Sequence, residues 1–245
     1  EIKRDEPGRD GEGIKNATIN RYLALIRAIL RRATLKWKWV DHPPMIELLP
    51  EDNERVRWLT REEARKLEEA LPDYYAKPMR FALATGLRQS NVLQIRWDQI
   101  DRERGCAWVH ARNAKAGKAI AVPLNEDALR VLDECQDQHE ERVFVKDGQP
   151  FRKIESRVWK RALAEAGLED FRWHDLLHTW ASWHVMSGTS LHELMQLGGW
   201  RTFVMVLRYA HLSADHLQDA ARRITHRPTP VPPPSSGRPR LRVVK

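Results

Sequence analysis

Between Trp173 and His211 the chain reads WHDLLHTWASWHVMSGTSLHELMQLGGWRTFVMVLRYAH. Apolar residues recur at helical spacing over residues 174–186 and again over residues 191–197. The Gly198-Gly199 pair then breaks the second run, and Trp200 follows it. The stretch therefore predicts two helices, a glycine break, and a Leu-Arg-Tyr-Ala-His step that ends at His211.

Helical patterns also dominate the chain outside this stretch. Apolar spacing and helix-start signals predict helices at about residues 18–36, 61–71, 74–84, 89–95, 125–138, 154–166 and 214–224. Strands are expected at residues 106–110 and 118–123, around a polar turn that contains Gly117, and residues 143–145 are a candidate third strand. The expected fold class is therefore mainly α with one small antiparallel β-sheet.

The sequence divides into pieces of different character. The helix at residues 18–36 has an apolar stripe that one helix cannot bury by itself, so residues 1–45 are expected to form part of a helical domain. Residues 46–57 are interpreted as a linker, and residues 58–225 as the main domain. Residues 226–245 are rich in proline and arginine and are expected to be disordered, because such a composition buries little apolar surface.

Composition and charge exclude several classes of protein. No run of about 18 apolar residues occurs, so no membrane span is expected, and residues 1–13 lack the apolar core of a signal peptide. Two widely spaced cysteines, Cys106 and Cys135, indicate a reduced, cytoplasmic compartment. The net charge is +8, but residues 222–245 carry six arginines, one lysine and no acid, which leaves +1 for the rest. Any basic surface that binds DNA must therefore be local.

Three groups of residues are candidates for catalytic chemistry. Arg88 follows a glycine break in Thr-Gly-Leu-Arg and is predicted at a helix N-terminus, where backbone N–H groups and a guanidinium can hold one phosphate. Lys115 lies in the turn between the two strands, from which a lysine can reach into a site as a proton donor. His174, Trp200 and Tyr209 lie in the stretch quoted above. Taken alone, each has an ordinary structural explanation as a solvated charge or a core aromatic.

In this order, the Thr-Gly-Leu-Arg motif, the hairpin lysine, the helix-start histidine, the Gly-Gly-Trp turn and the Tyr-Ala-His step resemble the catalytic domain of tyrosine recombinases. More narrowly, the chain is similar to phage and prophage integrases. The resemblance covers about residues 58–222. Residues 1–45 resemble the last part of that family's helical, SAM-like core-binding domain. The resemblance implies DNA recombination and integration.

The resemblance also implies a role for each matching residue. Tyr209 matches the nucleophile that forms a 3′-phosphotyrosyl link and releases a 5′-hydroxyl, and Arg88 matches the first arginine that holds the phosphate. Lys115 matches the general acid, with Lys118 as the less well aligned candidate. His174 matches the histidine that assists proton transfer, and Trp200 stands where the family has His or Trp. No metal or other cofactor is implied.

One position departs from the family pattern. The family has His-x-x-Arg where this chain has His174-Asp175-Leu176-Leu177, so the second arginine is replaced by Leu177. Losing one such donor typically costs about 10²–10³ in rate, or roughly 3–4 kcal/mol. Strand cleavage is therefore expected to be severely impaired. Leu177 itself is expected to pack under the helix and to leave the fold intact.

Several alternatives stay open from the sequence. A relic or modulator that binds DNA without cutting it fits Leu177 equally well, and a partner protomer that completes the site would restore an active enzyme. His174 and His178 also resemble part of a zinc signature, but no third ligand stands out. The basic tail is a candidate for nonspecific nucleic-acid binding.

The expected partner is double-stranded DNA. Arg27, Arg31 and Lys36 on the first helix are candidates for phosphate contact. The resemblance further implies self-association on DNA through the C-terminal helix, at about residues 214–224.

Overall fold

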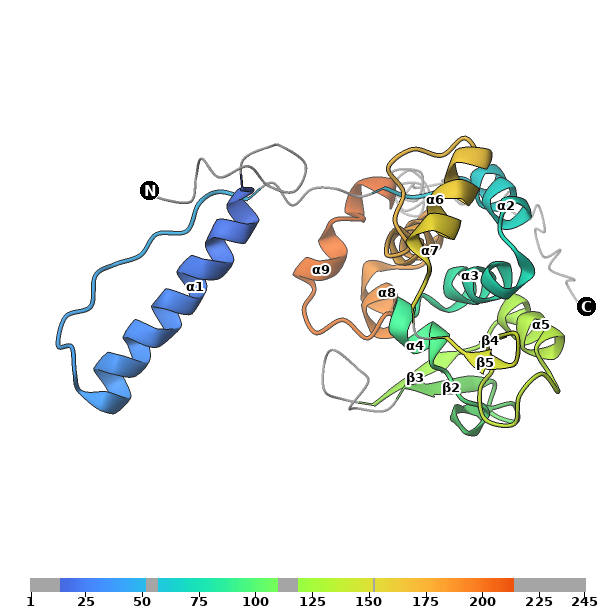
Figure 1. Cartoon of the computed structure of the whole chain (residues 1–245), viewed down its shortest axis with the longest axis horizontal. Coiled ribbons are helices and arrows are strands. Elements are labelled where there is room, and N and C mark those ends of the chain that lie inside the picture. The colour runs from blue at the N-terminus through green and yellow to red at the C-terminus, as the bar shows by residue number, and fades with distance from the viewer. Residues whose placement is uncertain (1–13, 52–56, 110–118, 152, 214–245) are drawn as a thin grey trace, which may run out of the picture. The chain divides into compact units, whose positions relative to one another are not determined.

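A computed structural model describes residues 14–51, 57–109, 119–151 and 153–213 (Figure 1). The chain forms two compact units, residues 1–55 and residues 56–245, which are described separately. Several predicted features lie outside the described residues: the helix at residues 214–224, the tail at residues 226–245, and the lysines Lys115 and Lys118.

The first unit is one long helix and the segment that follows it. Helix α1 (Asn16–Arg32) continues into a single π-helical segment, η1 (Ala33–Trp37), and Lys38 ends it in the left-handed conformation with φ 59°. The buried Asn20 side chain holds the returning segment, because its Nδ2 donates to the Leu49 carbonyl and its Oδ1 accepts from the Leu49 N–H, both at 2.8 Å. The apolar stripe of α1 is largely exposed, with Leu25 at 59%.

The second unit is mainly helical, as the sequence predicts. Its helices are α2 (Arg61–Ala70), α3 (Asp73–Thr85), α4 (Gln89–Leu93), α5 (Glu126–Glu134), α6 (Ser156–Glu165), α7 (Asp175–Met186), α8 (Leu191–Leu197) and α9 (Val204–Leu207), with short 3₁₀ turns η2 (Trp97–Gln99) and η3 (Ala210–Ser213). Thr60 and Glu63 form the capping box that begins α2. The short helix α9 was not predicted from the sequence.

A small antiparallel sheet lies beside these helices. Its strands β1 (Ile100–Asp101), β2 (Cys106–Val109) and β3 (Ile120–Pro123) follow chain order, and Ala107 pairs with Val122. The prediction that residues 143–145 add a third strand was wrong. The third strand is β1, while Val143 and Phe144 are core residues and Val145 opens a separate hairpin of β4 (Val145–Lys146) and β5 (Gln149–Pro150).

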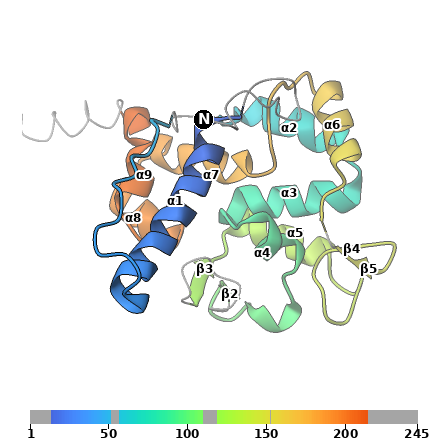
Figure 2. The same ribbon diagram turned by 60° about the vertical axis from the view of Figure 1, so that its left-hand side comes forward.

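Helix α3 links the parts of the second unit. It packs against α2, α5 and α7, and Figure 2 shows it between the α2–α6 pair and α5. Helix α7 in turn packs against α8 and η3. The buried apolar side chains form one large cluster around α3 and a smaller one that contains Leu177, Trp180, Val206 and Tyr209. Leu177 on α7 and Tyr209, which precedes η3, therefore belong to the smaller cluster.

The described part of the chain contains no helix that is long and apolar enough to cross a membrane.

Candidate active site

The N-terminus of α7 holds the first candidate residue in a defined position. His174 is the N-cap of this helix and is exposed. The next residue, Asp175, is buried and accepts a 2.8 Å hydrogen bond from the Arg172 N–H, which closes the turn before the helix. Thr179 anchors the same turn to the start of the second unit, because its hydroxyl accepts from the Leu59 N–H at 3.1 Å. The helix start is therefore fixed on both sides.

Arg88 occupies the N-cap of α4, as the sequence predicts. The preceding turn depends on Gly86, which ends α3 with φ +65°. A Cβ added to Gly86 would lie 2.4 Å from Cδ2 of Trp180, so the indole packs directly on the glycine backbone. Trp180 belongs to α7. The turn that carries Arg88 is thus packed on the helix that carries His174.

Tyr209 is almost completely buried, with 1% of its surface exposed. It lies between α9 and η3, and its hydroxyl oxygen is 2.7 Å from Nδ1 of His178. Burial raises the pKa of Tyr209 to about 12, although the charge of the neighbouring Arg208 acts in the opposite direction. At neutral pH the phenol is therefore protonated and hydrogen-bonded to a residue of α7.

Trp200 lies between the two other aromatic residues of this cluster. Its ring centroid is 6.1 Å from those of Trp180 and Tyr209. The Gly199 before it has φ +59°, and a Cβ there would lie 2.5 Å from Cδ1 of Ile120. Because Ile120 belongs to β3, the end of α8 packs closely on the sheet. The glycine break thus packs on the sheet through Gly199, and the next residue, Trp200, packs beside Tyr209.

Leu177, the residue at which the sequence departs from the expected His-x-x-Arg pattern, lies inside this apolar cluster. Leu177 is 7% exposed and belongs to the same buried cluster as Trp180 and Tyr209. Its side chain provides no charge and no hydrogen-bond donor at the place where the family pattern has a guanidinium. The expectation that Leu177 packs under the helix is confirmed. Arg172 and Arg208, the nearby alternatives in sequence, are both exposed.

The structure thus brings four of the predicted positions onto or beside α7. His174 and Leu177 belong to its first turn, while Trp200 and Tyr209 pack on the cluster that α7 contributes to. Arg88 joins them through the contact between Gly86 and Trp180. Lys115, the remaining predicted catalytic residue, lies outside the described residues.

Sequence reasoning assigned His178 no role in the recombinase chemistry. It was considered only as a possible zinc ligand together with His174, one helical turn away. The two rings meet edge to face with centroids 5.4 Å apart, and Nδ1 of His178 faces Tyr209. Within the described ranges no group of three or more His, Cys, Asp or Glu residues could hold a metal ion. The four-residue spacing places both histidines on one face of α7, but no local pattern in the sequence indicates the contact of His178 with Tyr209.

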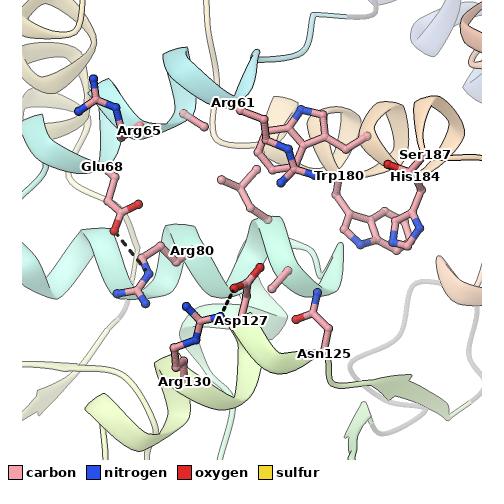
Figure 3. Close-up of a pocket in the computed structure, with 14 residues that line it drawn as sticks. Arg61, Arg65, Glu68, Arg80, Asn125, Asp127, Arg130, Trp180, His184 and Ser187 are labelled. Atoms are coloured by element: carbon pink, nitrogen blue, oxygen red, sulfur yellow. Dashed lines mark hydrogen bonds and ion pairs between the residues drawn. The ribbon is translucent and has the colours of Figure 1, made fainter.

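A separate pocket of about 620 Å³ opens between α2, α3, α5 and α7 (Figure 3). Most of its charges are paired internally: Arg80 lies 3.4 Å from Glu68, and Arg130 lies 2.9 Å from Asp127. Among the described residues, none of the predicted catalytic ones lines it. Trp180 borders both this pocket and the cluster that contains Tyr209.

The order and geometry of these residues agree with a comparison to protein families. Residues 57–216 match the model of the phage integrase family. The chain belongs to this family.

Relatives within and around this phage integrase family match most of the chain. It is 41% identical over 221 residues to an integrase of Salmonella phage P22, across 85% of this chain and 57% of that protein. It is 30% identical over 231 residues to a shufflon-specific DNA recombinase of Escherichia coli, across 89% of this chain and 58% of that protein. The chain thus spans less than two thirds of the length of these relatives.

Solved structures of phage and transposon integrases share the fold. A lambda integrase dimer bound to a COC′ core site superposes with a TM-score of 0.63 at 22% identity, covering 78% of this chain and 74% of that one. A Tn1549 transposon integrase in complex with transposon right end DNA gives 0.67 at 17% identity, covering 86% and 80%. The catalytic domain of bacteriophage HP1 integrase gives 0.55 at 23% identity, covering 69% and 95%.

Proposed function

We propose that this chain is the catalytic part of a tyrosine recombinase that acts on double-stranded DNA, with strand cleavage impaired by Leu177. The observation that carries the proposal is the convergence of Tyr209, Trp200 and His174 on helix α7 in a chain of the phage integrase family. Residues 58–225 form the catalytic domain in this proposal. Residues 1–45, a remnant of the core-binding domain, precede it, and residues 46–57 link the two.

In the proposed reaction, Tyr209 attacks a DNA phosphate and forms a 3′-phosphotyrosyl bond while a 5′-hydroxyl leaves. Arg88 holds a non-bridging phosphate oxygen, because a helix N-terminus and a guanidinium together favour an anion there. Lys115 protonates the leaving oxygen, and His174 assists proton transfer. Trp200 stands at the family's His-or-Trp position, beside Tyr209. The energy of the phosphodiester is kept in the covalent bond, so no metal or nucleotide takes part.

Leu177 limits the rate of this reaction because it supplies no positive charge. The transition state carries more negative charge on its non-bridging oxygens than the ground state does, and two guanidinium groups would share its stabilisation. With Leu177 buried at the second position, Arg88 supplies this charge without its partner. Cleavage is therefore slow by about 10²–10³, the cost of one such donor.

The first unit supplies DNA contacts in this proposal. Arg27, Arg31 and Arg32 share one face of α1, where they line a shallow groove with Ala28 and Leu35. Lys36 follows on η1. Clustered cations on one helix face suit the phosphate backbone, which binds proteins through counterion release. These residues would orient the chain on DNA without reading its sequence.

Self-association on DNA through the helix expected at residues 214–224 completes the proposal. The solved structure of a lambda integrase dimer bound to a core site supports an assembly of this kind through its likeness in fold.

Leu177 also favours a second candidate function, a DNA-binding modulator that no longer cuts. Such a protein keeps the fold and the DNA contacts, both of which are compatible with an apolar residue at the second arginine position.

The proposal is tested by covalent capture on DNA. Leu177→Arg is incubated with supercoiled plasmid without metal, and the reaction is stopped with a denaturant. We expect DNA covalently linked to protein, and we expect none with Leu177→Arg/Tyr209→Phe. Salt-dependent DNA binding by both variants without any covalent product would contradict the recombinase proposal and support the modulator.

A further inference from the structure

His178 is a buried polar residue in contact with the reacting atom of the proposed nucleophile. It is 8% exposed, and its Nδ1 lies 2.7 Å from the Tyr209 hydroxyl oxygen. The ring centroids of the two residues are 5.9 Å apart. Leu177 and Trp200 pack in the same cluster, so the hydrogen bond lies within an apolar surrounding.

The direction of this hydrogen bond follows from which of the two side chains carries a proton to donate. Burial keeps Tyr209 protonated at neutral pH, so its hydroxyl has one hydrogen to donate. A buried donor without an acceptor costs about 1–3 kcal/mol. In the described part of the chain, Nδ1 of His178 is the acceptor within reach of that hydroxyl. The imidazole is then the neutral tautomer that carries its proton on Nε2.

We propose that His178, rather than His174, is the base that accepts the Tyr209 proton. This inference rests on the proposed recombinase function. As the phenol oxygen bonds to phosphorus, its proton passes to Nδ1 of His178, the bond from phosphorus to the 5′-oxygen breaks, and that oxygen takes a proton from the general acid. In the reverse step, His178 returns its proton to the phenolate when the 5′-hydroxyl attacks.

The positions of the two histidines support this division. His174 caps α7 at the exposed end and presents its ring edge-on to His178, with centroids 5.4 Å apart. His178 lies one turn further into the core and contacts the phenol directly. Within the described residues, the titratable and charged groups that face the pair include His174 on the same helix and Arg208 on the segment of Tyr209, whose charge lowers the phenol pKa.

The inference also explains which part of the chemistry survives Leu177. Activation of the nucleophile needs His178 and Tyr209, and both are in place. What Leu177 removes is the charge that stabilises the phosphorane oxygens. A single substitution at residue 177 would therefore be enough to complete the site on α7.

A tautomer measurement tests the inference without any cleavage. Nitrogen-15 NMR of the histidine side chains in the unmodified chain distinguishes protonated from unprotonated ring nitrogens, and the His178 signals are those lost in His178→Asn. We expect an unprotonated Nδ1 and a protonated Nε2. A protonated Nδ1 would show that His178 donates to Tyr209 and would overturn the proposal.

A kinetic arm tests the proton transfer itself in the Leu177→Arg background. Asparagine at residue 178 retains an acceptor near the Nδ1 position but takes up no proton. Adding His178→Asn is expected to slow plasmid relaxation by about 10²–10⁴, the usual contribution of a general base. The decline in rate toward acidic pH that protonation of the base causes is expected to disappear as well.

His174→Asn in the same background is the matched control, and it is expected to keep that acidic decline. If His178→Asn leaves the rate and its pH profile unchanged, or increases the rate, His178 is not the base. If Leu177→Arg shows no relaxation at all, the recombinase proposal has failed, and the NMR result still decides the role of His178 in the hydrogen bond.

Discussion

Two helix N-termini in the second unit are proposed to hold the same phosphate, but they carry different side chains. Helix α4 begins at Arg88 and keeps its guanidinium, whereas the first turn of α7 has Leu177 where the family pattern has an arginine. Both helices depend on Trp180, which packs on Gly86 before α4 and belongs to the cluster of Leu177. The comparison shows that residue 177, in the first turn of α7, contributes apolar packing and no charge.

The physical reason lies in what each side chain needs from its surroundings. A buried leucine gains about 1.5–3 kcal/mol from leaving water. An arginine in the same place without a phosphate would bury an unpaired charge, which is costly. Leu177 is therefore expected to stabilise the DNA-free fold at the expense of catalysis, a trade between stability and activity that proteins often show at functional sites.

Among the variants that probe this comparison, the largest expected effect concerns Arg88, the N-cap residue of α4. In the Leu177→Arg background, Arg88→Ala removes one of two cations and is expected to slow plasmid relaxation by about 10²–10³. Arg88→Lys keeps the charge but loses the bidentate geometry, so an intermediate rate is expected. Equal rates for all three proteins would show that Arg88 does not hold the phosphate.

Gly86→Ala breaks the packing that joins the two helix starts. The added Cβ would meet Trp180 at 2.4 Å in a backbone with φ +65°, and overpacking of this kind costs about 1–3 kcal/mol beyond the backbone strain. Chemical denaturation measures the free energy of unfolding. Gly105→Ala is the matched control, because its φ is +60° and nothing lies within 4 Å of the added carbon. Equal losses for both variants would mean that the Trp180 contact contributes nothing.

Leu177→Arg is expected to lower the DNA-free stability by about 2–3 kcal/mol, since it removes buried apolar surface and adds a charge. Leu177→Met conserves the volume and is expected to cost less than about 1.5 kcal/mol. Thermal unfolding with and without DNA separates the loss of apolar burial from the cost of the unpaired charge. A DNA phosphate would pair with the new charge and raise the unfolding midpoint of the arginine variant alone. An arginine variant as stable as the original chain would contradict the trade between stability and activity.

The smallest effect concerns the other end of α7. Burial, and then the charge of Arg61, lowers the pKa of His184 from its usual 6.5. Below that pH the unfolded chain binds a proton that the folded chain resists, so stability is present above pH 6.5 and decreases as the pH falls through it.

His184→Asn keeps an acceptor for Thr189, whose hydroxyl lies 3.0 Å from Nδ1, but does not titrate. Its unfolding free energy is expected to decrease less between pH 7 and pH 5 than that of the original chain. Identical pH dependence in the two proteins would show that His184 does not contribute.

Much of the fold could be predicted from local signals in the sequence. The Thr60 capping box, the Gly86 break and the helical spacing of residues 174–186 each specify structure over a few residues, and the structure has these features. The third strand was misplaced because a short apolar run suits a core segment as well as a strand, and only tertiary packing separates them. Helix α9 was missed because four residues show too little periodicity.

The candidate site was only partly predictable. Motif order pointed to Arg88, His174, Trp200 and Tyr209, and the structure places the last three around α7. The hydrogen bond from Tyr209 to His178 joins residues 31 positions apart, and no local pattern indicates it. The burial of Tyr209 likewise depends on how η3 packs on α7 and α9 packs on α8, which the sequence alone does not specify.

The most direct test of the account is the rate at which supercoiled plasmid is relaxed, in the absence of metal, by the unmodified chain, Leu177→Met and Leu177→Arg at equal concentration. We predict that Leu177→Arg is faster than the unmodified chain by about 10²–10³, the contribution of one donor to the developing phosphate charge, and that Leu177→Met is not. Relaxation by the unmodified chain at the rate of Leu177→Arg would contradict the account, because another group would then already supply the charge that Leu177 lacks.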